Sequence, residues 1–348
     1  MVTRRARFVG MALGAAGALV ACANILGIED LQNGTPPPIE AGPDVPAIDP
    51  CTSPPGPRKP TTADGTTQGP ILLALDSIDF GDSFDPPGVN LDLRCTYAED
   101  AGSCVPLAGK VPTGQIDGDG GVDNSSVNVL ANKAFPLTVA GRVVDAVKNH
   151  IWTLLFRLDD YSGAADDPSV TLRVVTGASV DVDGGPDAGS WAVDGLLADA
   201  GMQSAPPSTV AWVAGGVLRA EFGDLQFVAR SNGLGTFLMR LRSAYVIGSL
   251  DVAKKTLKGT IAGRWSAADA TLEISRLKVG PTCVSSIITD SLCRTQDIKT
   301  NPKDDNKGFE CDALSVAFRF TAADNAFGQA SVDGGDLTPA QCATSPCN

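Results

Sequence analysis

Apolar and polar residues alternate with a period of two along most of the chain beyond residue 88. The alternation is clearest in residues 152–158, 170–174 and 314–321, and it is also present in 89–93. Successive side chains of a β-strand point to opposite faces of the sheet, so each run predicts a strand with one buried face. The same reasoning predicts further strands at residues 209–222, 225–230, 236–250 and 256–265. Gly- and Asp-rich turns separate the runs, which is typical of antiparallel connections.

Helices are predicted to be few. Residues 123–125 can cap a helix leading toward Phe135, and residues 137–149 give a second helical pattern. Residues 266–269 have capping-box spacing and Gly280 and Pro281 supply a stop, which predicts a helix over 267–279. Another helix is predicted within 283–293. The sequence therefore predicts one mainly β domain over residues 70–348, an antiparallel β-sandwich with a few helices at its edges.

The first 21 residues have the composition of a secretory signal. Three arginines precede an apolar run of 14 residues, 8–21, which is shorter than the roughly 20 residues needed to span a bilayer. The run ends in Leu-Val-Ala-Cys, which resembles the lipobox of bacterial lipoproteins and implies lipidation of Cys22. Two or more acyl chains give stable membrane anchoring. By resemblance to lipoprotein sorting, Ala23 favours the outer membrane. The alternative is ordinary signal cleavage after Ala23.

Eight cysteines remain after either cleavage: Cys51, Cys95, Cys104, Cys283, Cys293, Cys311, Cys342 and Cys347. An even number in an exported chain predicts up to four disulfides in an oxidising compartment. Cys95 and Cys104 flank a turn-like segment, so a Cys95–Cys104 disulfide across a hairpin is predicted. One straight helix carrying both Cys283 and Cys293 would keep them about 15 Å apart, so these two are not expected to pair.

Acidic residues dominate the part of the chain that follows the signal. The first 21 residues hold three of the 27 basic residues and no acidic residue, which leaves 24 basic against 40 acidic residues and a net charge of −16. Phosphate repulsion would oppose nucleic-acid binding, because no basic cluster offsets this charge. Ten of the 24 prolines lie within residues 36–60. This composition predicts that residues 22–69 form a semi-rigid tether.

Four segments resemble a family of uncharacterised lipoproteins from Gram-negative soil bacteria. They are VNLDLRCTYAEDAGSC, DGDGGVDNSSVN, HIWTLLFRLDDYSGAADDPSVTLRVV and CDALSVAFRFTA. The likeness covers residues 89–175 and 283–321 in part, about a third of the chain. It supports an exported, disulfide-containing β-rich domain and implies no activity.

The stretch IDFGDSFD, residues 78–85, resembles the nucleophile block of GDS-type esterases. Such an enzyme needs a helix after the serine and a histidine as its base. Pro86 and Pro87 oppose a helix after Ser83, and the chain's one histidine, His150, does not stand in the required Asp-x-x-His block. A catalytic role for Ser83 is therefore not expected, and neither is a zinc site with a single histidine.

The pattern D-x-D-G-G-x-D occurs twice, at residues 117–123 and 181–187. Calcium takes six to eight oxygen ligands, and alternate aspartates around a glycine turn can supply several of them. The first copy predicts a calcium site at Asp117, Asp119 and Asp123. The alternative is an ordinary turn, since Asp and Gly are common turn residues and Asp123 can cap a helix.

Two functions remain from these observations. The first is a non-enzymatic binding or structural module, held by its lipid anchor at the outer membrane and facing an extracellular or cell-wall ligand. The alternative is a calcium-assisted protein that binds or degrades glycans. Nothing in the spacing of the acidic residues selects a catalytic pair, so an enzyme is not the expectation.

Overall fold

The computed structural model describes residues 49, 51–62, 65–81, 86–96, 102–107, 117, 121–131, 138–179, 191–198, 201–231, 233–333, 336–340, 342 and 347. All of them belong to one compact unit, residues 49–348. The sequence features assigned to Cys22, Ser83, Asp119 and residues 181–187 lie outside the described residues.

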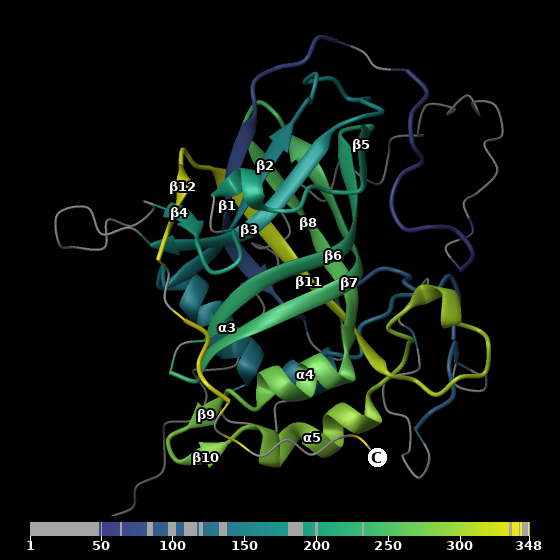
Figure 1. Cartoon of the computed structure of the whole chain (residues 1–348). Coiled ribbons are helices and arrows are strands. Elements are labelled where there is room, and N and C mark those ends of the chain that lie inside the picture. Colours follow the sequence, from purple (N-terminus) through teal and green to yellow (C-terminus); the bar gives the residue numbers. More distant parts are fainter. Residues whose placement is uncertain are drawn as a thin grey trace, which may run out of the picture. The chain divides into compact units, whose positions relative to one another are not determined.

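A ten-stranded sheet forms the centre of this unit, with the order β12-β4-β3-β2-β1-β11-β8-β7-β6-β5 (Figure 1). Its strands are β1 Ile71–Asp79, β2 Trp152–Asp159, β3 Thr171–Ser179, β4 Trp191–Asp194, β5 Val210–Ala214, β6 Val217–Ser231, β7 Gly235–Asp251, β8 Thr256–Ser266, β11 Ala313–Asp324 and β12 Gly328–Val332. All neighbours pair antiparallel except β12 and β4, which pair in parallel.

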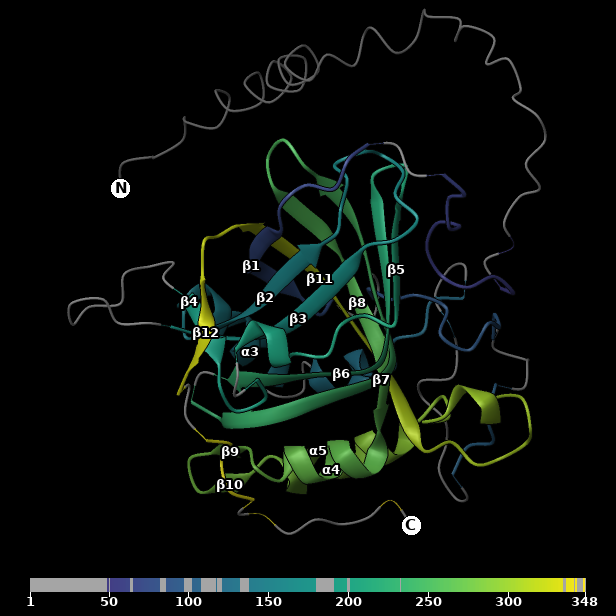
Figure 2. The same ribbon diagram turned by 45° about the horizontal axis from the view of Figure 1, so that its top comes forward.

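The sheet curls until β5 meets the start of β3 (Figures 1 and 2). Val170 N donates to Ala211 O at 3.1 Å and Ser208 N donates to Leu172 O at 2.8 Å, which joins the two ends of the curl. One edge of β3 pairs with β2. On the other edge, the start of β3 lies against β5 and the end of β3 pairs with β4. The expected two-sheet sandwich is not confirmed: one curled, mixed sheet takes its place, because the twist of long strands such as β6 and β7 brings its ends together.

Side chains on the inner face of the curl form the main core. β11 shows the period of two: Leu314, Val316, Phe318 and Phe320 point inward, whereas Ser315 and Ala317 lie on the outer face. The ring of Phe318, on the inner face, packs against the rings of Phe80 and Phe227. Because the inner face is closed with packed side chains, the polar groups that could bind a ligand lie on the outer face.

The described residues contain few helices, as the sequence predicts, but the first is shorter than expected and begins after Ser126 rather than at residues 123–125. The helices are α2 Val127–Leu130, α3 Val139–Lys148, α4 Ala267–Ile274 and α5 Ser285–Arg294. Ser266 caps α4, since its side chain accepts a hydrogen bond from Asp269 N at 3.1 Å. Helix α4 ends before the predicted limit of residue 279, where the short strands β9 Lys278–Val279 and β10 Thr282–Cys283 begin. Helices α4 and α5 run side by side next to β7 (Figure 2).

Three of the expected strands differ from the structure: 89–93, 209–222 and 225–230, the last of which continues β6 rather than forming a strand of its own. Residues 86–96 form an irregular segment, in which Val89 makes only an isolated bridge to Asp123. The expected strand 209–222 is divided at Gly215 and Gly216, both at positive φ, into β5 and the start of β6. Side chains of residues 86–96 cover the outer face of β8 and β11, where Leu91 packs against Ala262 and Ala317. The alternation does not report burial here, because Asn90 and Asp92 are buried, at 5% and 7% exposed, whereas Leu93 is 43% exposed.

Part of the segment predicted as a tether lies against the domain. Cys51 forms a disulfide with Cys95, and Pro57 O accepts a hydrogen bond from Trp212 Nε1 at 3.2 Å. The guanidinium of Arg219 stacks on the Trp212 ring at 4.5 Å from its centroid. These contacts hold residues 51–57 on the outer surface of the sheet.

Candidate functional site

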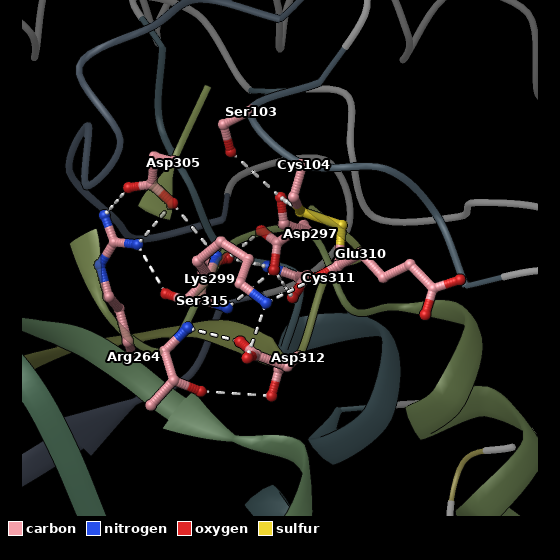
Figure 3. The surroundings of a disulfide bond; sticks show 12 residues. Ser103, Cys104, Arg264, Asp297, Lys299, Asp305, Glu310, Cys311, Asp312 and Ser315 are labelled. Atoms are coloured by element: carbon pink, nitrogen blue, oxygen red, sulfur yellow. Dashed lines mark hydrogen bonds and ion pairs between the residues drawn. A yellow bond between two sulfur atoms is a disulfide. The ribbon is translucent and has the colours of Figure 1, made fainter. Parts of the chain in front are cut away.

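Buried polar groups gather on the outer face of β8 and β11, beneath residues 295–305. Arg264 and Ser315 face each other in the register of these two strands, so both side chains emerge on the same side. Asp297 lies over them: its carboxylate accepts hydrogen bonds from Ser315 N at 2.9 Å and from Ser315 Oγ (Figure 3). It also accepts one from Ser125 Oγ at 2.8 Å. The three donors fix this carboxylate in the interior.

Arg264 forms the cationic side of this polar layer. It is 1% exposed, pairs with Asp305 at 2.7 Å and donates to Lys299 O at 2.7 Å (Figure 3). It also donates to Leu91 O at 2.6 Å. One side chain thus joins the covering segment 86–96 to the loop that follows Asp297. Removing one partner of such a buried pair leaves an uncompensated charge, so the contact defines how both segments are placed.

Burial raises the pKa of four aspartates in this layer, Asp92, Asp117, Asp123 and Asp297, and is the largest cause for each. Repulsion adds to it: Asp92 raises the pKa of the other three, Asp117 and Asp297 also raise that of Asp123, and Asp305 raises that of Asp92. The pKa of Asp297 rises to about 7 and that of Asp117 to about 6, while the pKa of Asp123 lies well above its ordinary value. Asp123 Oδ2 accepts hydrogen bonds from Leu91 N at 2.5 Å and Asp92 N at 3.3 Å.

The structure brings together two of the three residues expected to bind calcium. Asp117 and Asp123 belong to the same group of carboxylates, which also contains Asp92. Asp119 lies outside the described residues. Within the described part of the chain, no group of three or more His, Cys, Asp or Glu side chains has the arrangement of a metal site. The oxygens of Asp117 and Asp123 instead accept backbone hydrogen bonds from Thr96 N and Leu91 N.

A cleft of about 890 Å³ lies beside this polar layer. Its lining comes from the start of α4, the loop 296–300 and the segment 309–312, and it includes Leu107 and Cys347. Apolar groups make up much of this lining, and Leu272 and Phe309 are 44% and 51% exposed there. The volume falls in the range of small-molecule pockets, roughly 300–1,000 Å³, which are mostly apolar with few polar groups.

Two disulfides hold the walls of the cleft. Cys104 is bonded to Cys311, 207 positions away, and Cys293 of α5 is bonded to Cys347. Val105 N also donates to Phe309 O at 2.8 Å, and Cys311 N donates to Val105 O at 2.8 Å. Because covalent and backbone bonds fix the walls, the cleft is formed before any ligand arrives, which lowers the ordering cost of binding.

One amide in the lining has an unused hydrogen-bonding group. Gln296 is 4% exposed, and its Nε2 has no partner among the described residues. A buried polar group without a partner costs about 1–3 kcal/mol. The next residue, Asp297, faces the polar layer instead, so neighbouring side chains serve the cleft and the acidic group separately. Gln296 therefore places an unsatisfied buried donor next to the cleft, and contact with a ligand requires its side chain to turn toward the lining.

The charged groups of the lining are Lys299, Glu310 and Asp312. Lys299 Nζ is bound by Asp312 Oδ2 at 2.7 Å and by Glu310 O at 2.6 Å (Figure 3). Burial acts to raise the pKa of Asp312, but hydrogen bonds from Lys299 and Thr300 outweigh it and lower the pKa. The side chain of Glu310 points away from this pair (Figure 3). The Lys299–Asp312 pair has no net charge, so the carboxylate of Glu310 is the remaining charge among the described residues of the lining.

The predicted Cys95–Cys104 disulfide is wrong. Cys95 pairs with Cys51, and Cys104 pairs with Cys311. A hairpin requires two paired strands, whereas residues 86–96 are irregular and Val105 bridges Glu310. The expectation that Cys283 and Cys293 do not pair is confirmed, since they pair with Cys342 and Cys347.

His150 does not line the cleft. It follows α3 and has a positive φ of 54°. Its ring centroid lies 6.3 Å from that of Trp191 in β4, a strand that β3, β2, β1 and β11 separate from β8 in the sheet. Sequence patterns did not indicate Gln296, Asp297 or the cleft. These residues lie in the irregular segment after α5, where no period or motif distinguishes them.

No protein-family model, curated protein or solved structure matches the chain. The structure itself places the chain in a broad class: a mainly β domain with four disulfides, which fits an exported protein. In the described residues, no helix combines the length and the apolar composition that spanning a bilayer requires.

Proposed function

We propose that this chain is a lipid-anchored, exported binding protein, and that the cleft beside the Cys104–Cys311 disulfide is its binding site. The observation that carries the proposal is the preformed cleft of about 890 Å³ with an unpartnered amide in its lining. The proposed domain is non-enzymatic: Lys299 and Asp312 neutralise each other in the lining, and the spacing of the acidic residues selects no catalytic pair. Cys22 provides the anchor at the outer membrane.

A neutral, apolar fluorescent dye tests the proposal. Nile red should bind the exported chain carrying Cys22→Ser with one saturable site, because the substitution removes the acyl chains that would compete for the dye. Leu272→Glu should abolish this binding by placing a charge in the lining. Leu196→Glu is the matched control, since Leu196 is similarly exposed, at 39%, and does not line the cleft. Equal dye binding by both variants would exclude the cleft as the site.

The second candidate function is calcium-assisted binding of glycans. The observation that favours it is the group of four aspartates with raised pKa, two of which, Asp117 and Asp123, belong to the repeated D-x-D-G-G-x-D pattern. A divalent cation would relieve their repulsion and would need Asp119 or backbone oxygens to complete its shell. A glycan and cell-wall binding screen with and without calcium tests it. Retention on a polysaccharide only when calcium is present would support this function.

A further inference from the structure

We propose that the cleft selects neutral or cationic amphiphiles, with an apolar body and a hydrogen-bonding head, over anionic ones such as fatty acids. The proposal deepens the function given above and rests on it. Three features carry it: the charge of the lining, the use of the donors at the start of α4, and the position of Gln296.

Lys299, the one cation among the described residues of the lining, is already occupied. Its Nζ donates to Asp312 Oδ2 and to Glu310 O, and its side chain is 12% exposed. Asp312 is held in turn by Thr300 N at 2.6 Å. An anionic ligand would have to break this arrangement to gain a cationic partner. It would also meet the carboxylate of Glu310, which makes the sum of lining charges −1.

Helix α4 begins at the cleft, and the N-terminus of a helix attracts anions when its N–H groups are free. Here two of the N–H groups in the first turn are used within the protein. Ala267 N donates to Asp312 O at 2.8 Å, and Asp269 N donates to Ser266 Oγ at 3.1 Å. Asp269 also places a carboxylate in the first turn of the helix. The start of α4 therefore does not reverse the charge preference.

Gln296 supplies the polar contact. A half-turn of its amide exchanges the nitrogen and oxygen, so the side chain can donate to or accept from a neutral head group. Leu107, Leu272 and Phe309 offer an apolar surface for the rest of the ligand. A primary amide or an ammonium on a chain of several methylenes fits this combination.

Three probes with the same eight-carbon chain test the selection at pH 7.5 and low salt: octanamide, octylammonium and octanoate, each measured by displacement of Nile red. Octanamide and octylammonium should bind at least about tenfold more tightly than octanoate, the factor that corresponds to 1.4 kcal/mol. Glu310→Gln should narrow the difference in affinity between octylammonium and octanoate, because it should weaken the binding of octylammonium and strengthen the binding of octanoate.

Gln296→Leu separates the role of the amide from that of the fold. The substitution removes a buried group without a partner, so the thermal midpoint should be unchanged or higher. Octanamide affinity should fall about fivefold, in line with the loss of one hydrogen bond of about 1 kcal/mol, while Nile red binding is kept. Octanoate binding as tightly as octanamide would overturn the proposal, and so would failure of all three probes to displace the dye. The proposed function would survive either result if Leu272→Glu still abolished dye binding.

Discussion

Ser125 Oγ donates a hydrogen bond to Asp297 Oδ1 at 2.8 Å, although the two residues are 172 positions apart in the chain. Both side chains are buried on the outer face of β11, where Ser315 supplies two more donors. The contact joins the residues before α2 to the residues after α5. It therefore ties two distant parts of the chain together at a buried carboxyl one residue from Gln296, which lines the cleft.

The stability of the domain should depend on the charge of Asp297. Burial raises the pKa of this carboxyl to about 7, above its ordinary value of 3.8. The folded state then holds a proton that the unfolded state has lost, so the contribution of Asp297 to stability is fully present below about pH 4 and is lost as the pH rises through about 7. Asp297→Asn should cost about 1–3 kcal/mol at pH 5, from lost hydrogen bonds, and distinctly less at pH 8.

Urea unfolding at the two pH values measures this difference. Asp290→Asn is the control, because Asp290 is an exposed carboxylate on α5 that pairs with Arg294. The control should change stability little at either pH. A cost for Asp297→Asn that grows between pH 5 and pH 8 would contradict the assignment.

Calcium, if the loop 117–123 binds it, should compete with protons. Burial raises the pKa values of Asp117 and Asp123, and a cation would replace the protons that these groups hold. Millimolar calcium should therefore raise the thermal midpoint more at pH 8 than at pH 5. At a hundred times the dissociation constant the gain is about 2.7 kcal/mol.

Matched variants locate this effect. Asp119→Ala should abolish the rise in the midpoint, whereas Asp183→Ala, in the second copy of the pattern, should leave most of it. If millimolar calcium leaves the wild-type melting curve unchanged, the loop 117–123 is an ordinary turn and not a calcium site.

Much of the sheet could be predicted from the sequence, because the period of two reports directly on which face of a strand is buried. Strands β2, β7, β8 and β11 lie close to the predicted ranges, and Ser266 caps α4 as expected. The curl could not be predicted in this way. It depends on the pairing of β5 with the start of β3, and alternation within single strands does not record which strands become neighbours.

The candidate site was less accessible to sequence reasoning. The loop containing Asp117 and Asp123 was found by its repeat, and the structure adds Asp92 and Asp297 to it. Asp92 lies in an alternating stretch that resembles a strand, and Asp297 lies in a segment without a pattern. Long-range contacts such as Ser125 to Asp297, and disulfides such as Cys104–Cys311, bring these parts together and leave no local signal.

The disulfides can be checked by peptide mapping without reduction. The expected pairs are Cys51–Cys95, Cys104–Cys311, Cys283–Cys342 and Cys293–Cys347. Replacing Cys104 and Cys311 together by Ser should lower stability by about 2–5 kcal/mol, since the bond closes a long loop. The double variant should also weaken Nile red binding, because this bond holds one wall of the cleft. A peptide that joins Cys95 to Cys104 would contradict the structure.

Lipidation is expected at Cys22. Metabolic labelling with a fatty-acid analogue should mark the wild-type chain in the membrane fraction and should not mark Cys22→Ser. The reason is that Leu19 to Cys22 resembles a lipobox at the end of a 14-residue apolar run. Equal labelling of both chains would refute the assignment.

Hydrogen exchange with and without octanamide tests the binding site most directly. Peptides from residues 266–272 and 296–312 line the cleft and should exchange more slowly when the ligand is bound. Peptides from residues 205–209 and 223–226, which line a separate cavity of about 440 Å³, should not change. Protection at this second cavity, with unchanged exchange at 266–272 and 296–312, would contradict the assignment of the cleft as the binding site.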